Sequence, residues 1–294
     1  MAQMDVFQSM WGMEKILPDG SEWTLETKFK RIAEAGFKGV SFDLPYHSFE
    51  TVKQALPYLN EYDLDVVFNP FVSSTEDYQN VLKQISSFNR PIRFCGLIGQ
   101  IEPWHLDRVV EQTHEWLDAG KAAGIPTHVE VHRSCMTNDF LFTLQLMEKV
   151  PELKMIADLS HVLVNQEWYL PLSERASELV TRFLKRTEAI HGRVGTREQA
   201  QVASGFKQHE PWFQQFQDWW QEGFLLWQRR QSNKAARCVF LCELGPPPYA
   251  ITGADGKELS TRWEEALALK ATAEKLWREA EKQADKTLLK YIKG

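Results

Sequence analysis

The sequence lacks the features that mark secreted and membrane-spanning proteins. It nowhere has about 18 apolar residues in a row, so no membrane-spanning helix is predicted. Residues 1–13 contain no basic segment followed by an apolar one, so no export signal is predicted either. The four cysteines, Cys95, Cys135, Cys238 and Cys242, include no C-x-x-C pair, which argues against a disulfide framework and a zinc knuckle. We therefore expect a cytoplasmic protein with reduced, mostly buried thiols.

Clustered basic charge is also missing. The 294-residue chain has 34 Lys and Arg and 40 Asp and Glu, a formal net charge of −6, and its basic residues are scattered. Because nucleic-acid-binding domains carry a basic patch, neither nucleic acid nor a membrane is expected as a partner. Hydrophobic residues make up 43% of the chain, enough for a large core. No linker rich in Pro, Gly or Ser divides it, so we expect one domain over residues 1–294.

Short strand-like runs alternate with amphipathic helical stretches, as is typical of parallel βα units. The strand-like runs are Val6–Met10, Gly39–Asp43, Asp65–Asn69, Ile92–Leu97, Thr127–His132, Lys154–Asp158, Ala189–Arg193 and Val239–Glu243. The helical stretches are Thr24–Ala35, Phe49–Glu61, Glu76–Phe88, Pro103–Ala123, Phe140–Lys149, Pro171–Lys185, Pro211–Arg229 and Ser260–Tyr291. Gly36 and Gly124 follow two of these helices at the position of a left-handed C-cap. The pattern predicts an α/β fold, a (β/α)8 TIM barrel, with a doubly wound sheet as the alternative.

Polar residues stand at the ends of the last four predicted strands, where TIM-barrel enzymes place catalytic groups. These ends read Glu130-Val131-His132-Arg133, Asp158-Leu159-Ser160-His161, His191-Gly192-Arg193 and Glu243-Leu244-Gly245. Successive side chains of a strand point to opposite faces. If the neighbouring apolar residues Val129, Val131 and Ala157 face the helices, then Glu130, Asp158, His191 and Glu243 all face the inside of the barrel. By the same alternation His132 and Arg193 face inward as well.

Three carboxylates in one small space repel one another unless a cation lies among them. Three oxygen ligands and one imidazole favour an octahedral ion over structural Zn²⁺, which prefers sulfur and nitrogen. We therefore predict one divalent cation, with Mn²⁺ as the first choice and Mg²⁺ or Co²⁺ as the others. The predicted metal ligands are Glu130, Asp158, His191 and Glu243. Separate buried salt bridges are the alternative interpretation.

The segment from residue 205 to residue 231, between the last two predicted strands, is long and rich in tryptophan. Trp212, Trp219, Trp220 and Trp227 recur at helical spacing, which favours packing of a helix against the barrel. A hydrophobic wall over the active site and a subunit interface are the alternatives. As a βα insertion at the catalytic end, the segment is predicted to lie beside the active-site mouth or at a subunit contact.

The strand-end motifs, read in chain order and continued by Val194-Gly195 and Gly245-Pro246-Pro247-Pro248-Tyr249, resemble the xylose-isomerase-like superfamily. The run Ile32-Ala33-Glu34-Ala35-Gly36-Phe37-Lys38-Gly39-Val40 is similar to the first helix and second strand of that superfamily. The superfamily includes sugar isomerases, ketose 3-epimerases, inosose dehydratases and endonuclease IV. The Val194-Gly195 pair and the proline-rich turn look closest to a poorly characterised isomerase/epimerase-like branch.

The resemblance implies roles for individual residues. Glu130, Asp158, His191 and Glu243 fall on the metal ligands of the superfamily, and the two glutamates fall on its catalytic acid/base pair. His161 and Arg197 fall on residues that contact the sugar. His132 and Arg193 are further candidates for substrate binding.

The expected chemistry is proton abstraction next to a carbonyl, through an enediolate bound to the metal. We expect an isomerase or epimerase that acts on a small carbohydrate, and no phosphate-binding loop is visible in the sequence. The alternative is a lyase or dehydratase that eliminates from a keto-sugar, keto-glycoside or inosose. A phosphodiesterase such as endonuclease IV would need several metals and a basic face, and a non-enzymatic descendant would be expected to lack a ligand. The oligomeric state is open, a homo-oligomer included.

Overall fold

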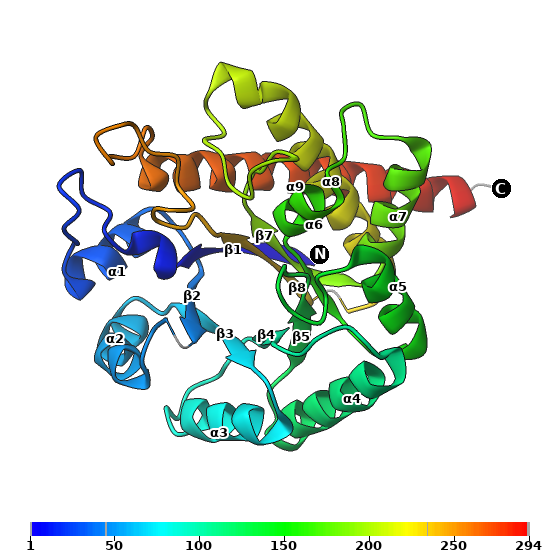
Figure 1. Cartoon of the computed structure of the whole chain (residues 1–294), viewed down its shortest axis with the longest axis horizontal. Coiled ribbons are helices and arrows are strands. Elements are labelled where there is room, and N and C mark those ends of the chain that lie inside the picture. Colours follow the sequence, from blue (N-terminus) through cyan, green and yellow to red (C-terminus); the bar gives the residue numbers. More distant parts are fainter. Residues whose placement is uncertain (1, 45, 234, 293–294) are drawn as a thin grey trace.

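The structure, a computed structural model, describes residues 2–44, 46–233 and 235–292, with side-chain surroundings up to residue 284. Parallel strands close into a barrel in the order of the chain, and β1 pairs with β8 (Figure 1). The strands are β1 (Gln3–Ser9), β2 (Gly39–Leu44), β3 (Asp65–Val72), β4 (Cys95–Gly99), β5 (Thr127–Glu130), β6 (Met155–Ala157), β7 (Thr187–Gly192) and β8 (Arg237–Cys242). The (β/α)8 TIM barrel is confirmed, and the doubly wound sheet was wrong because the sheet has no free edge.

Helices form a ring outside the barrel (Figure 1). They are α1 (Leu25–Glu34), α2 (Phe49–Glu61), α3 (Thr75–Ser86), α4 (Leu106–Ala122), α5 (Phe140–Lys149), α6 (Leu159–Gln166), α7 (Glu174–Leu184), α8 (Glu210–Arg230) and α9 (Arg262–Ile292). Thr24, Ser48, Ser74 and Ser173 cap the first turns of α1, α2, α3 and α7, which explains where these helices begin. Short helix α6 was not predicted, because it starts at the residue after Asp158 without an intervening turn.

The core has two layers. Inside the barrel lies a cluster made of Phe7, Val67, Phe94, Ile156, Ala189, Val239 and Leu241. A larger apolar layer fills the space between the strands and the helices. Ile156 and Leu241 belong to the inner cluster and lie two residues before Asp158 and Glu243. The predicted alternation of these strands is therefore confirmed, and the inner cluster forms the floor beneath the strand-end residues.

The tryptophan-rich segment is part of the outer ring. Its helix α8 packs between α7 and α9 and against β7. Trp219, Trp220 and Trp227 are at most 3% exposed, and the Trp220 ring meets the Phe240 ring at 5.1 Å between centroids. The packing of a helix against the barrel, which the tryptophan spacing favoured, is confirmed for these three side chains, whereas the position of the segment beside the active-site mouth or at a subunit contact stays a prediction. The three side chains are buried because the helix after β7 has to cover the outer faces of β7 and β8.

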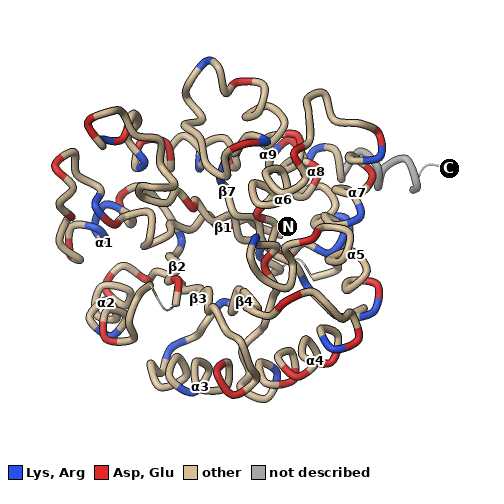
Figure 2. Tube along the Cα trace, in the orientation of Figure 1, with Lys and Arg blue, Asp and Glu red and all other residues tan. Residues whose placement is uncertain are grey.

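Charge and hydropathy of the surface are ordinary. Acidic and basic residues are interspersed along the outer helices (Figure 2). In the described ranges, no helix has both the length and the apolar character needed to cross a membrane. The absence of a nucleic-acid partner and the cytoplasmic location stay predictions.

Candidate metal centre

The four predicted metal ligands meet at the carboxyl-terminal end of the barrel. Glu130 is the last residue of β5, His191 lies in β7, and Asp158 and Glu243 directly follow β6 and β8. One ligand atom from each of the four lies within 4.8 Å of the corresponding atoms of the others. All four side chains are buried, with Glu243 the most exposed at 6%. The backbone alternation of four neighbouring strands is what brings these polar groups together above the apolar floor.

His191 lies between two glutamates. Its Nδ1 is 2.9 Å from Glu243 Oε2 and 3.5 Å from Glu130 Oε1. Burial lowers the pKa of His191, but the two carboxylates outweigh burial and raise this pKa well above its ordinary value. His191 Nε2 and Glu130 Oε2 are buried without a hydrogen-bond partner in the described part of the chain. Unpaired oxygen and nitrogen atoms at this spacing fit a divalent cation with carboxylate and imidazole ligands.

Asp158 differs from the two glutamates because both of its oxygens already accept hydrogen bonds. Oδ1 accepts from the backbone N–H of Ser160 at 3.0 Å and from Ser160 Oγ at 2.5 Å, and Oδ2 accepts from Arg193 Nη2. Burial raises the pKa of Asp158, but the positive charge of Arg193, and to a smaller extent His161, lowers it. The lowering is the larger effect, so the pKa of Asp158 lies below its ordinary value. Asp158 is therefore an ionised carboxylate that an internal cation partly neutralises.

Arg193 lies inside the cluster and is only 1% exposed. Besides the bond to Asp158, its Nε donates to Ser160 Oγ at 3.2 Å, and its Nη2 lies 3.7 Å from Glu243 Oε2. Its guanidinium also stacks over the ring of Tyr249 at 5.0 Å. The sequence predicted that Arg193 faces inward but did not predict this pairing, because an alternation pattern gives the face of a side chain and not its partner.

Two members of the cluster, Glu130 and Glu243, line a pocket at the barrel mouth. Its lining residues are Trp11, Asp43, Tyr46, Phe71, Ile98, Glu130, His132, Arg193, Glu243 and Tyr249. Aromatic rings contact one another along its wall: Trp11 meets Tyr249 at 5.0 Å, and Phe71 meets Tyr46 at 5.6 Å and His132 at 5.7 Å between centroids. The pocket thus combines acidic groups with apolar ring faces.

Comparison with solved structures identifies this architecture. D-psicose 3-epimerase with D-tagatose, from Clostridium cellulolyticum H10, matches with a TM-score of 0.59 and 13% identity, over 93% of this chain and 99% of that chain. L-ribulose 3-epimerase matches with a TM-score of 0.60 and 13% identity, over 98% of both chains. A xylose isomerase-like TIM barrel protein from Mycobacterium smegmatis, in complex with magnesium, has a TM-score of 0.58 and 12% identity, over 94% of this chain and 100% of that chain. The chain has a xylose isomerase-like TIM-barrel fold. No family model and no curated protein matches the sequence.

Two predicted substrate-binding histidines, His132 and His161, lie beside the cluster of Glu130, Asp158, His191 and Glu243 in this barrel. The rings of His132 and His161 are 4.0 Å apart, and together with Glu130 they form a second group of close ligand-type side chains. His132 lines the pocket, with its Nδ1 2.6 Å from the carbonyl oxygen of Arg133. His161 lies behind it, 3.1 Å from Arg193 Nη2, and burial lowers its pKa. Their roles toward a substrate stay predictions.

Arg197 contacts Tyr169 and Glu198, and neither of these belongs to the cluster. Its guanidinium stacks over the Tyr169 ring at 3.7 Å, and its Nε donates to Glu198. Arg197 is not among the residues that line the pocket at the barrel mouth. Its predicted contact with the sugar stays a prediction.

Asp43, in β2, is a pocket residue that the sequence analysis did not select. It is 5% exposed, and its Oδ1 accepts a hydrogen bond from Asn69 Nδ2 at 2.7 Å. Burial raises the pKa of Asp43 to about 7, and the negative charge of Glu243 adds to this effect. Asp43 is an acid at the end of the predicted strand Gly39–Asp43, so the sequence does mark it as a possible site residue. It stands alone there, whereas the last four predicted strands all end in ligand-type residues and so predict a common site.

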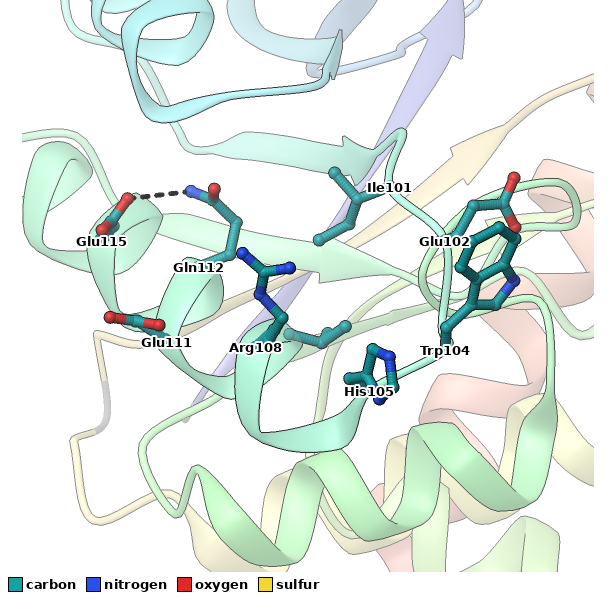
Figure 3. A pocket seen from close by; sticks show the side chains of 9 residues that line it. Ile101, Glu102, Trp104, His105, Arg108, Glu111, Gln112 and Glu115 are labelled. Carbon is teal, nitrogen blue, oxygen red and sulfur yellow. Dashed lines mark hydrogen bonds between the residues drawn. The ribbon is translucent and has the colours of Figure 1, made fainter.

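A separate groove lies on the outer surface over α4 (Figure 3). It has a volume of about 340 Å³ and is lined by Ile101, Glu102, Trp104, His105, Arg108, Val109, Glu111, Gln112 and Glu115. Gln112 donates a hydrogen bond to Glu115 at 3.2 Å within it. None of the strand-end residues lines this groove, so the candidate chemistry belongs to the smaller pocket at the barrel mouth.

Proposed function

We propose that this chain is a divalent-metal-dependent enzyme that isomerises or epimerises a small carbohydrate. The observation that carries the proposal is the meeting of ligand atoms of Glu130, Asp158, His191 and Glu243 within 4.8 Å of one another, beside an aromatic-lined pocket that Glu130 and Glu243 also line. Solved structures with the same fold include epimerases, one of them with D-tagatose. The epimerase structures support a carbohydrate as the ligand class. The solved structure of a xylose isomerase-like TIM barrel protein in complex with magnesium supports a divalent cation.

The four ligands would hold one ion, with Mn²⁺ as the first choice and Mg²⁺ or Co²⁺ as the others. Such an ion supplies Lewis acidity, which polarises a carbonyl or hydroxyl oxygen and acidifies the neighbouring carbon-bound proton. The donor set of three carboxylates and one imidazole suits these hard cations better than structural zinc.

Glu130 and Glu243 are the proposed proton-transfer groups. Glu130 ends β5 and Glu243 directly follows β8, three strands apart, and both line the pocket at the barrel mouth. One carboxylate removes a proton from the carbon next to the carbonyl, and a protonated carboxyl returns a proton. Return to the opposite face of the same carbon gives an epimer, and return to the neighbouring carbon gives an isomer.

The remaining pocket residues are proposed to bind the sugar. Trp11, Phe71 and Tyr249 present ring faces that suit the C–H faces of a carbohydrate. Arg193 and His132 line the same pocket and offer hydrogen-bond donors for its oxygens. His161 and Arg197 are proposed as sugar contacts only because they fall on sugar-contacting residues of the superfamily that the strand-end motifs resemble.

The lyase alternative uses the same site, because an elimination also begins with removal of the proton next to a carbonyl. The two functions differ in their products. An isomerase or epimerase conserves the mass of the carbohydrate, whereas a lyase gives a new double bond or a released leaving group. Mass spectrometry of the product therefore separates them.

The metal site is tested by elemental analysis of the purified protein. We expect about one divalent metal ion per chain, the occupancy of a single carboxylate and imidazole cluster. His191→Ala and Glu243→Gln should each lower the occupancy strongly while the far-UV circular dichroism spectrum is unchanged. The first removes a ligand and the second replaces a charged ligand by a neutral, weaker one, and neither disturbs the apolar layer beneath the cluster.

The matched controls are His114→Ala and Glu115→Gln, which change the same residue types on α4, outside the barrel, where His114 is half-buried and Glu115 is exposed. Both should retain the occupancy of the wild type. Full occupancy in His191→Ala and in Glu243→Gln would show that the cluster is not the metal site.

A further inference from the structure

Asp43 faces the metal cluster from the other side of the pocket. In the closed barrel, β2 stands diametrically opposite β6, which carries Asp158 at its end. Asp43 lines the same pocket as Glu130 and Glu243. It belongs to neither group of close ligand-type side chains, so it is not placed to join the four metal ligands. The space between Asp43 and the cluster is where a bound substrate would lie.

One oxygen of Asp43 has no partner. Oδ1 accepts from Asn69 Nδ2, but Oδ2 is buried without a hydrogen-bond partner in the described part of the chain. An unpaired buried acceptor costs free energy, so native structures supply it with a donor from protein, water or ligand. Other buried acids of the barrel have such a donor: Asp158 binds Arg193, and Asp5 binds Arg93 and Arg237. Asp43 has no ion-pair partner of this kind among the described residues.

The backbone around Asp43 is held rigidly. His47 Nδ1 lies 3.2 Å from the backbone nitrogen of Asp43, and the backbone nitrogen of His47 donates to the carbonyl oxygen of Asp43 at 2.8 Å. His47 itself is buried, and burial lowers its pKa to about 4, so it is neutral near pH 7. With Asn69 holding one oxygen and His47 the backbone, the side chain of Asp43 is held in place where it lines the pocket, and its second oxygen is left without a partner. Pre-organised acceptors of this kind discriminate between ligands that have a donor and ligands that lack it.

We propose that Asp43 binds a hydroxyl group of the carbohydrate substrate on the side opposite the metal, with Oδ2 accepting the hydrogen bond. This inference rests on the proposed function. An ionised carboxylate only accepts hydrogen bonds, so it selects a hydroxyl and not a carbonyl at this position. Burial raises the pKa of Asp43 to about 7, so its carboxylate is ionised above that pH, and a cation that neutralises Glu130 and Glu243 removes the smaller effect of their negative charges. The substrate is therefore a polyhydroxylated sugar that carries a hydroxyl several bonds away from the carbon that loses its proton.

The test is isothermal titration calorimetry, in which the Mn²⁺-loaded protein is titrated separately with D-tagatose, D-allulose, D-fructose and L-ribulose. The ketose that binds best is then compared with its monodeoxy analogues. In the wild type, one analogue should bind about 10-fold or more weakly than the parent ketose, the usual scale for a lost hydrogen bond to a charged group. In Asp43→Asn the parent ketose should bind about 10-fold more weakly. In Asp43→Ala the difference between the parent ketose and that analogue should disappear.

Two controls separate this role from a structural one. Mn²⁺ affinity should change by less than about twofold in both Asp43 variants, because Asp43 lies outside the ligand cluster. Ser41→Ala removes another inward polar atom of β2, one that does not line the pocket, and should leave ketose binding unchanged. The assignment of Asp43 would be overturned if Asp43→Ala bound the ketose with wild-type affinity. It would also be overturned if each deoxy analogue lost the same affinity, relative to the parent ketose, in the wild type and in Asp43→Ala. If the wild type binds none of the ketoses and catalyses no exchange, the proposed function fails instead.

Discussion

Glu130→Gln is expected to hold metal when the metal is supplied in excess, yet to exchange solvent deuterium into a ketose about 10²-fold or more slowly than the wild type. Glutamine keeps the shape of the side chain and one oxygen ligand, but it has no basic carboxylate. The variant should therefore still bind the metal and the ketose, but it should not transfer the proton. The measurement combines elemental analysis with NMR or mass spectrometry of the ketose incubated in D₂O.

Glu111→Gln is the matched control for this experiment, because Glu111 is an exposed carboxylate on α4, outside the barrel mouth. It should exchange deuterium at the wild-type rate. If Glu130→Gln with restored metal also exchanges at the wild-type rate, the proton-transfer role belongs to another group. His132 and His161, which form the second cluster with Glu130, are the next candidates.

Arg193→Met is expected to lower the free energy of unfolding by about 3–5 kcal/mol in the presence of EDTA. Both partners are fully buried, and removal of the guanidinium leaves the Asp158 carboxylate without its cation. Excess Mn²⁺ should restore a large part of this loss, because a cation bound to the native state neutralises Asp158 and stabilises the fold by mass action. The measurement is urea denaturation with EDTA and with Mn²⁺.

The control is Arg237→Met. Arg237 pairs with the buried Asp5, but its side chain is 43% exposed and Arg93 also binds Asp5. Its loss should cost no more than about 1 kcal/mol, the scale of an exposed ion pair, and Mn²⁺ should not reverse it. A loss of equal size in the two variants, or a loss in Arg193→Met that Mn²⁺ leaves unchanged, would contradict the internal-cation role of Arg193.

Much of the fold follows from local patterns. The repetition of strand, helix and glycine C-cap is a property of neighbouring residues, and Gly36 and Gly124 adopt the positive φ angles that the pattern requires. The boundaries were less accurate at the strand ends. β5 ends at Glu130 and not at His132, and β6 covers only Met155–Ala157, because pairing stops where the polar residues turn toward the pocket.

The meeting of the four ligand-type side chains was also predictable. Residues at the ends of neighbouring parallel strands are neighbours in space, and alternation gives the face on which each side chain lies. The sequence therefore predicts that Glu130, Asp158, His191 and Glu243 lie close together, and in the structure they do, while their roles as metal ligands stay a prediction.

The alternation of strands and helices, and the inward direction of the strand-end acids, could be predicted from the sequence, because both depend on a period of two or 3.6 residues along the chain. Only the tertiary structure decided which groups became partners. Arg193 pairs with Asp158, and Asp43 from β2 faces the cluster with one oxygen unpaired. Partner choice depends on the closure of the barrel and on side-chain reach across it, and neither of these is a local property of the sequence.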